Sequence, residues 1–212
     1  QTEVTLGCQI VRDDNRQTAR AQVVSDVISE RLWKVLREDA GVTYGAYSYP
    51  QLYEGGTAAM YMASLVQNDA VGFAVSSMFT IVDESASGKV DEDALLAAKW
   101  TRARQYGLGQ QSGEQMMNRL LGTNLGKLDF FETYPQDLGA VSSADFGPVL
   151  EPCKGHEVVT LIGPKQYAID QLTKEGIPFE VVDWEALHTS QLNKKELKAW
   201  EKKKAKKDEE DA

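Results

Sequence analysis

Arg37 and Tyr44 are the side chains whose chemistry stands out in this sequence of 212 residues. They lie seven positions apart, on either side of Gly41. Arginine presents five N–H donors in a planar fork that suits a carbonyl or carboxylate, and a phenol can donate to an oxygen that gains negative charge. In a binding site, these two chemistries would serve to orient a substrate and to stabilise charge. The structural alternative is that Arg37 interacts with a helix dipole and Tyr44 packs on a sheet.

Metal and nucleophile motifs are missing from the chain. A hydrolytic zinc site needs at least three nitrogen, oxygen or sulfur ligands, and the only histidines are His156 and His188. Neither H-E-x-x-H nor H-x-x-E-H occurs, and there is no G-x-S-x-G turn or phosphate loop. Gly107-Leu108-Gly109 is expected to end a helix. A site in this chain would therefore work by binding, orientation or charge stabilisation.

The composition predicts a packed globular chain, with 42% hydrophobic and 26% charged residues. The formal net charge is -9, and an acidic surface repels phosphate backbones, so we expect no nucleic-acid partner. No apolar run reaches the roughly 20 residues of a membrane span. A strand pattern begins at Thr2 without a preceding methionine, which indicates a processed piece of a longer protein. The sequence therefore leaves the compartment unknown, with a periplasmic location favoured for a bacterial source.

The two cysteines, Cys8 and Cys153, form no C-x-x-C pair, which argues against a thiolate zinc site or a redox motif. Two buried free thiols are the expected state. A disulfide between them is the alternative, and it would need an oxidising compartment and close Cα atoms.

The elements that must position Arg37 are a strand and a long helix. Residues 1–11 alternate between polar and apolar, as a half-buried strand does. Asp13 and Asp14 are candidate N-caps, and apolar residues at helical spacing continue to about Glu38. Gly41 is the expected helix stop, because glycine adopts positive φ without penalty.

A hairpin must position Tyr44. Strands are predicted over residues 42–49 and 57–66, and residues 50–56 are expected to form the turn. The period of two along a strand would place three residues on one face: Tyr44, Ala46 and Ser48.

The remaining pattern predicts a layered α+β fold. Helices are expected over 68–83, 91–110 and 112–122, short turns over 128–134, a short helix capped by Ser142 or Ser143, a buried strand over 157–162, a helix over 165–174 and a last strand over 179–182. Together with the hairpin, this order predicts an antiparallel sheet covered by helices on one face. Residues 1–187 would form the domain. Residues 188–212 would form a charged tail, with a solvated helix from Asn193 that frays toward its end.

The segment from Ser29 to Tyr44 resembles the pitrilysin/insulinase family of zinc metallopeptidases, which includes mitochondrial processing peptidase. The family pattern has S-x-R-L, then L-R-E, a glycine, and a tyrosine seven positions after the arginine. Here S-E-R-L begins at Ser29, L-R-E contains Arg37, and Gly41 precedes Tyr44. The order of strand, helix, hairpin and later helix from Asp91 agrees over about residues 1–183.

The resemblance implies the C-terminal, non-zinc domain of such a peptidase, with a mitochondrial-processing-peptidase-like metallohydrolase fold. In that family a homologous zinc-bearing domain faces this one across a closed chamber, so zinc is expected in that partner domain and the substrates are peptides. This chain alone would be inactive. Tyr44 is expected to stabilise the oxyanion or an adjacent carbonyl, and Arg37 to orient the peptide backbone. Further candidates for the chamber wall, or else for the sheet core, are Tyr47, Tyr49, Tyr53, Tyr61 and Met62.

Two other functions compete with the assisting half of a zinc endopeptidase. One is a non-catalytic scaffold of the same fold, such as the core subunits of a mitochondrial respiratory complex. The other is an unrelated α+β interaction module with an accidental match at Arg37 and Tyr44. A parent protein or neighbouring gene with an H-x-x-E-H segment would favour the peptidase.

Overall fold

The computed structural model describes residues 1–11, 15–53, 57–122 and 129–210, so the candidate caps Asp13 and Asp14 lie outside the described residues. Contacts divide the chain into two compact units, Gln1–Ile177 and Pro178–Ala212. The first unit contains the sheet together with Arg37 and Tyr44. The domain boundary predicted after residue 187 falls within a helix of the second unit.

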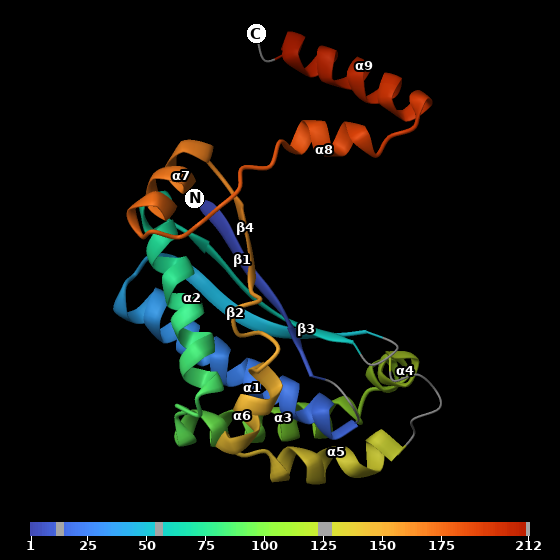
Figure 1. Ribbon diagram of the computed structural model, residues 1–212. Coiled ribbons are helices and arrows are strands. Elements are labelled where there is room, and N and C mark those ends of the chain that lie inside the picture. The colour runs from blue at the N-terminus through green and yellow to red at the C-terminus, as the bar shows by residue number, and fades with distance from the viewer. Residues whose placement is uncertain (12–14, 54–56, 123–128, 211–212) are drawn as a thin grey trace. The chain divides into compact units, whose positions relative to one another are not determined.

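Four antiparallel strands form the sheet, in the order β2-β3-β1-β4 (Figure 1). Their bounds are β1 Thr2–Ile10, β2 Thr43–Leu52, β3 Ala58–Val66 and β4 Val158–Ile162. The alternation of β1 is confirmed, since Val4, Leu6 and Ile10 are all buried. These side chains face the helices, and the other face of the sheet stays open.

Helices cover the apolar face of the sheet, as the sequence predicts. The layer next to the strands consists of α1 (Asn15–Leu32), its continuation as the π-helix η1 (Trp33–Asp39), and α2 (Val71–Ala86) with the 3-10 turn η2 (Asn68–Ala70) before it. The rest of the unit is made of α3 (Glu92–Gly109), α4 (Gly113–Gly122), α5 (Asp129–Ala140), η3 (Ser143–Asp145), α6 (Phe146–Leu150) and α7 (Lys165–Lys174). Among these, α3, α5 and α6 pack on α1, and α6 and α7 pack on α2. The α+β class is confirmed.

A disulfide joins Cys8 and Cys153, where two free thiols were expected. Cys8 lies on the covered face of β1, and Cys153 follows α6, with the Cα atoms 5.0 Å apart. The residues are 145 positions apart, so only the packing of α6 beside β1 brings them together. Closing so long a loop restricts the unfolded chain and stabilises the fold.

Two segments contain proline inside regular structure, contrary to the sequence prediction. β2 continues through Pro50, where a turn was expected. β2 is an edge strand, and proline is tolerated there because its missing N–H can face away from the neighbouring strand. α5 replaces the short turns expected before Tyr134 and contains Pro135. Tyr134 and Leu138 lie on one helix face and are both buried, so tertiary packing outweighs the proline.

Two predicted strands differ from expectation. β4 is not buried: it is an edge strand paired only with β1, and Val158 and Ile162 are 68% and 65% exposed. Residues 179–182 form no strand at all. An apolar run alone does not distinguish a central strand from an edge or an extended linker.

The second unit consists of α8 (Trp184–Ser190) and α9 (Lys194–Glu210), the latter being the predicted tail helix. Asp183 caps α8 by accepting from Ala186 N–H at 3.0 Å. Lys204 pairs with Glu185, which ties α9 to α8. Across the described part of the chain, no helix combines the length and apolar character needed to cross a lipid bilayer.

Candidate functional site

The end of η1 brings Arg37 next to the start of β2. Ala40 N–H donates to the carbonyl of Val35 at 3.2 Å, and Val42 N–H donates to that of Leu36 at 3.0 Å, so this turn is wider than an α-helical one. Gly41 follows with φ +66°, which confirms it as the helix stop and explains the glycine. π-helical turns of this kind are frequent at functional sites.

Arg37 and Tyr44 lie together in the folded chain. The Arg37 Cζ atom is 5.0 Å from the centre of the Tyr44 ring, and Arg37 Nη1 donates to the Thr43 carbonyl at 3.2 Å. Tyr44 is 79% exposed, whereas Arg37 is half-buried. The cation–π contact and the hydrogen bond hold the guanidinium in place, while the phenol faces solvent.

Tyr44 does not share a face with Ala46 and Ser48, which corrects the prediction from strand alternation. Thr43 pairs with Val66 and Ala46 pairs with Ser64, so β2 uses one residue more than β3 between these two pairs. The extra residue is a β-bulge. Ala46 and Ser48 face the helices and are buried, and Tyr44 is turned to the open face. Bulges are common next to active sites, where they redirect a side chain.

Two buried hydroxyl groups hold the bulge. Gly45 N–H donates to Thr43 Oγ1 at 3.1 Å, and Thr43 Oγ1 donates to the Leu65 carbonyl at 2.8 Å. Ser64 Oγ donates to the Gly45 carbonyl at 2.9 Å. The backbone groups that the bulge takes out of the ladder therefore keep partners, which fixes the direction of Tyr44.

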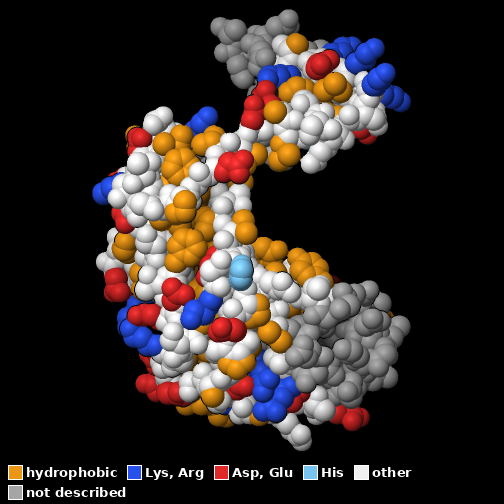
Figure 2. All heavy atoms as spheres, in the orientation of Figure 1, with side chains coloured by type: hydrophobic (Ala, Val, Ile, Leu, Met, Phe, Trp, Pro, Cys, Tyr) orange, Lys and Arg blue, Asp and Glu red, His pale blue; other side chains and the backbone are white. Residues whose placement is uncertain are grey.

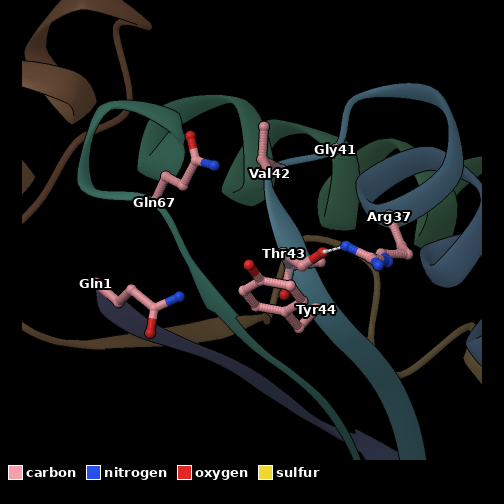
Figure 3. A pocket seen from close by; sticks show the side chains of 7 residues that line it. All are labelled: Gln1, Arg37, Gly41, Val42, Thr43, Tyr44 and Gln67. Carbon is pink, nitrogen blue, oxygen red and sulfur yellow. Dashed lines mark hydrogen bonds between the residues drawn. The ribbon is translucent and has the colours of Figure 1, made fainter.

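A shallow pocket of about 80 Å³ lies beside Tyr44 (Figure 3). Its lining residues are Gln1, Arg37, Gly41, Val42, Thr43, Tyr44 and Gln67. Gln67 N–H donates to the Val42 carbonyl at 3.0 Å, which joins the end of β3 to the approach of β2. Sequence reasoning missed Thr43, Ser64 and Gln67, because their roles depend on strand pairing and leave no local motif.

Further tyrosines lie outside the pocket lining and contact one another. Ring centres are 6.0 Å apart for Tyr47 and Tyr49, and 5.4 Å apart for Tyr49 and Tyr61. The Tyr53 and Tyr61 hydroxyls are 3.4 Å apart, and this hydrogen bond raises the pKa of Tyr53. Gly7 lies opposite Tyr61, where a Cβ atom would be only 3.0 Å from the ring, so glycine makes room for it.

Met62 differs from these tyrosines, because it is fully buried on the covered face. It belongs to the core and is removed from the candidate chamber wall. Hydrophobic side chains reach the surface at several places on the first unit (Figure 2).

The outer edge of β2 is closed at Ser48. Ser48 N–H donates to Ser29 Oγ at 2.7 Å, and Ser29 Oγ donates to the Ser48 carbonyl at 3.1 Å. Helix α1 thus takes up the backbone groups that an added strand would use. A ligand would reach this part of the sheet from its open face.

The side chains of the residues that the structure describes offer no fit to a zinc ion. Within the described ranges, no group of three His, Cys, Asp or Glu side chains converges on one point. His156 is exposed near the disulfide, and His188 lies in the second unit, with its ring 6.0 Å from that of Trp200. Both cysteines are used by the disulfide.

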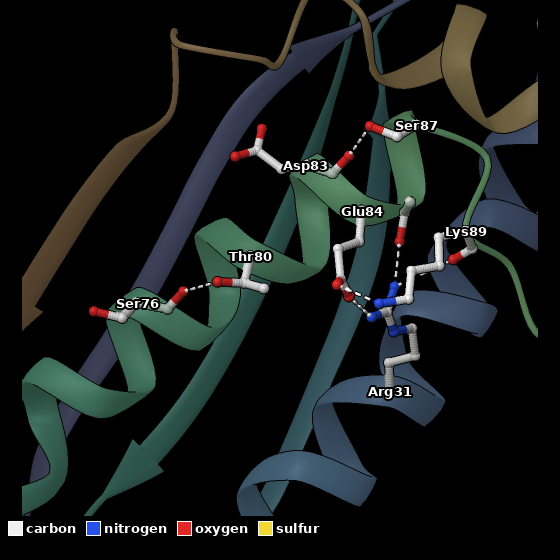
Figure 4. A network of polar contacts seen from close by, with 8 residues as sticks. Arg31, Ser76, Thr80, Asp83, Glu84, Ser87 and Lys89 are labelled. Carbon is white, nitrogen blue, oxygen red and sulfur yellow. Dashed lines mark hydrogen bonds and ion pairs between the residues drawn. The ribbon is translucent and has the colours of Figure 1, made fainter.

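Three other arginines of the helical layer, Arg20, Arg31 and Arg102, are paired with carboxylates. Arg31 binds Glu84, which also binds Lys89 at 2.5 Å, and Arg31 Nη1 donates to Ser85 Oγ at 3.3 Å (Figure 4). The hydrogen bonds from Lys89 and then Arg31 lower the pKa of Glu84. Arg37 is different: among the described residues it has no ion pair.

Comparison with known proteins relates the segment that contains this site to a known family. The family model described as the peptidase M16 inactive domain matches residues 1–102. The fold is similar to the periplasmic protease PqqL from Escherichia coli, with a TM-score of 0.64 and 13% identity, covering 77% of this chain and 19% of that chain. A peptidase M16 inactive domain from Pseudomonas fluorescens gives a TM-score of 0.61 and 16% identity, covering 77% of this chain and 42% of that chain. A chain of complex III2 from Candida albicans gives a TM-score of 0.61 and 10% identity, covering 80% of this chain and 46% of that chain.

Comparison with curated protein sequences gave no match. The chain spans 19% to 46% of the length of the three solved chains, and at these identities the similarity shows the fold. Together with the match of residues 1–102, it confirms the family resemblance carried by the segment from Ser29 to Tyr44.

Proposed function

Because this chain carries the inactive domain of the peptidase M16 family, we propose that it is the substrate-binding, assisting half of a zinc-dependent endopeptidase. The zinc would be held by a homologous domain, either in the same polypeptide or in a partner subunit. On this proposal the chain alone does not hydrolyse peptides, and its contribution is made through Arg37 and Tyr44.

The observation that carries the proposal is the way Tyr44 is presented. The β-bulge, which the buried Thr43 hydroxyl fixes, turns the Tyr44 side chain to the open face of the sheet, contrary to strict strand alternation. There its ring contacts the half-buried guanidinium of Arg37. Exposing the ring in this way is not explained by core packing, because Tyr44 is 79% exposed. Core packing was the alternative role for a tyrosine in this strand.

The chemistry follows from the two side chains. Attack on a peptide carbonyl places negative charge on its oxygen, and the Tyr44 phenol can donate a hydrogen bond to that oxygen. Loss of one such donor typically costs about 2.7–4 kcal/mol of transition-state stabilisation. Arg37 keeps N–H donors beyond the one used by the Thr43 carbonyl, and these can orient the peptide.

The test uses the complete enzyme, with its zinc-bearing domain, and compares Tyr44→Phe with Tyr47→Phe. Tyr47 is a matched control, because it is an exposed tyrosine of β2 that does not line the pocket. Tyr44→Phe should lower kcat about 10²- to 10³-fold with zinc content unchanged, and Tyr47→Phe should leave kcat close to that of the parent. Equal kcat values for the two variants would remove the role assigned to Tyr44.

A scaffold function is the second candidate, favoured by the similarity to a chain of Candida albicans complex III2. A scaffold needs the fold and its docking surfaces but has no use for the Tyr44 hydroxyl. If the complete protein neither holds zinc nor cleaves peptides, the scaffold becomes the better account. Arg37 and Tyr44 would then be structural residues.

A further inference from the structure

Helix α9 concentrates positive charge in a chain that is acidic overall. Residues 194–205 contain six lysines and two glutamates, whereas the net charge of the chain is -9. Figure 2 shows lysine side chains at the surface of this second unit. Lys204 pairs with Glu185, and the other five lysines are exposed, with no ion pair among the residues that the structure describes.

Contacts with α8 fix the direction in which α9 points its side chains. Lys204 pairs with Glu185, and its Nζ atom is 5.3 Å from the centre of the Trp200 ring. That ring centre is 6.0 Å from the centre of the His188 ring. Because Glu185 and His188 belong to α8, Lys204 and Trp200 mark the side of α9 that packs on α8.

The side of α9 that faces away from α8 carries lysine and alanine. Lys194, Lys198 and Lys202 follow one another at intervals of four residues, so they lie on one side of the helix, about 6 Å apart along its axis. By the same helical period, Glu196 and Glu201 lie at the borders of this side. We call it the lysine face, and its members are all exposed: Lys194, Lys195, Lys198, Ala199, Lys202 and Ala205.

Helix stability does not explain the lysine face. Like charges four residues apart repel one another on a helix. Lys194 and Lys195 also stand in the first turn, where the helix dipole favours acidic side chains. Both features oppose the isolated helix, and an anionic partner placed against the lysine face would offset both.

The side chains of the second unit favour a lipid surface over a nucleic acid as that partner. Residues 178–212 contain no arginine, the residue that binds phosphates in a planar, bidentate way. The lysine face has no aromatic side chain on which a base could stack. The phosphates of a nucleic acid are fixed along its backbone, whereas lipid headgroups move sideways and can gather under the lysines, away from Glu196 and Glu201.

We propose that the lysine face of α9 binds the surface of a bilayer that contains anionic phospholipids, with the helix lying along that surface. The small side chains of Ala199 and Ala205 let the lysine stems lie against the headgroups. Each lysine near such a surface strengthens binding about 5-fold. This interaction goes beyond the proposed peptidase function and does not depend on it.

The test measures sedimentation of the 212-residue chain with lipid vesicles. The chain should bind vesicles made of equal parts phosphatidylglycerol and phosphatidylcholine in about 0.1 M salt, and it should not bind vesicles of phosphatidylcholine alone. Binding should be lost in about 1 M salt, because the Debye length falls from about 10 Å to about 3 Å. Equal binding to the two kinds of vesicle would overturn the proposal.

A triple variant locates the binding on α9. Replacing Lys194, Lys198 and Lys202 together with Gln should weaken binding to the anionic vesicles about 10²-fold, with the helix content unchanged by circular dichroism. Replacing the same three residues with Arg should keep the binding, because a diffuse surface requires charge and no particular donor geometry. Loss of binding in the Arg variant would contradict a diffuse lipid surface.

A matched triple variant controls for net charge. Lys34, Lys154 and Lys165 are exposed lysines of the first unit, and replacing them together with Gln removes the same charge. This control should bind the anionic vesicles within about 2-fold of the parent, since charges beyond a Debye length are screened. Equal weakening in the two triple variants would show that net charge alone is responsible, and the lysine face would be wrong.

Duplex DNA and peptide hydrolysis separate this inference from other functions. If the chain binds duplex DNA through the lysine face and leaves the anionic vesicles unbound, the partner is a nucleic acid and the lipid surface is wrong. If the complete enzyme with the lysine-face variant hydrolyses a soluble peptide at the parental rate while vesicle binding is lost, both proposals stand. Vesicle binding in a complete protein without peptidase activity would support the lysine face and remove only the proposed function.

Discussion

Arg37 and Arg102 show two uses of the same side chain on the helices that cover the sheet. Arg102 of α3 makes two bonds of 2.6 Å to Asp26 of α1, and both side chains are only 25% exposed. Arg37 bonds a backbone carbonyl and rests on the exposed ring of Tyr44. The first arginine joins two helices, and the second keeps N–H donors that no carboxylate of the described residues occupies. Family resemblance drew attention to Arg37, but its lack of a carboxylate partner is the physical feature that separates it from Arg102.

The same contrast holds for the two faces of the sheet. The covered face carries the apolar core and the Cys8–Cys153 disulfide, and its side chains hold the fold together. The open face carries exposed tyrosines and the pocket, and its side chains contribute little to packing. Variants of the covered face should therefore change stability, whereas variants of Arg37 and Tyr44 at the pocket should change binding and turnover.

The largest effect on stability should follow loss of the disulfide on the covered face. Replacing both Cys8 and Cys153 with Ser should lower the free energy of unfolding by about 2–5 kcal/mol, because the unfolded chain is no longer closed into a long loop. Urea denaturation of the oxidised parent and the double variant measures this difference. An unchanged midpoint would mean that the disulfide does not stabilise the covered face.

The pair of arginines gives the next contrast. Arg102→Met leaves Asp26 partly buried without its partner and should cost about 2–3 kcal/mol of unfolding free energy. Arg37→Met should cost less, about 1 kcal/mol, because it removes a single hydrogen bond to the Thr43 carbonyl. Thermal or urea unfolding of both variants measures these changes. Similar losses of unfolding free energy in the two variants would contradict the different roles of Arg37 and Arg102.

The bulge connects the two faces, so its disruption should affect both stability and turnover. Thr43→Val removes the hydroxyl that accepts from Gly45 N–H, and should cost about 1–2 kcal/mol. The complete enzyme should also lose turnover, because Tyr44 is no longer directed to the open face. Thr43→Ser keeps the hydroxyl and serves as the control; if Thr43→Val retains full turnover, the bulge does not position Tyr44.

The smallest effect should be the pH dependence of the Glu84 cluster. Lys89 and Arg31 lower the pKa of Glu84 in the folded chain, so its contribution is present above the unfolded pKa, near 4.5. It is lost as the pH falls through the lower, folded pKa. Glu84→Gln should therefore lower the melting temperature at pH 7 and converge with the parent in strong acid; a gap that persists in strong acid would contradict this assignment.

Much of the fold could be predicted because it depends on local periodicity. The alternation around Leu6, the helical spacing before Leu36 and the stop at Gly41 all report burial or backbone geometry within a few residues. The exposed edge position of β4 could not be predicted in this way. An apolar run is the same in the sequence whether one or two strands lie beside it.

The residues of the candidate site could be proposed from the sequence, whereas their geometry could not. Arg37 and Tyr44 could be selected from their chemistry and the family pattern, and the stop at Gly41 brings them together. The direction of Tyr44 depends on a bulge fixed by Ser64, a residue of the neighbouring strand. Strand alternation therefore assigned Tyr44 to the wrong face, since long-range hydroxyl contacts leave no period in the sequence.

The most direct test of the assisting role is peptide hydrolysis by the zinc-bearing half, measured alone, with this chain and with this chain carrying Tyr44→Phe. We predict bound zinc in the zinc-bearing half in every case, and rapid turnover only when the unmodified chain is present. Full turnover by the zinc-bearing half alone, or the same turnover with Tyr44→Phe as with the unmodified chain, would contradict the assisting role.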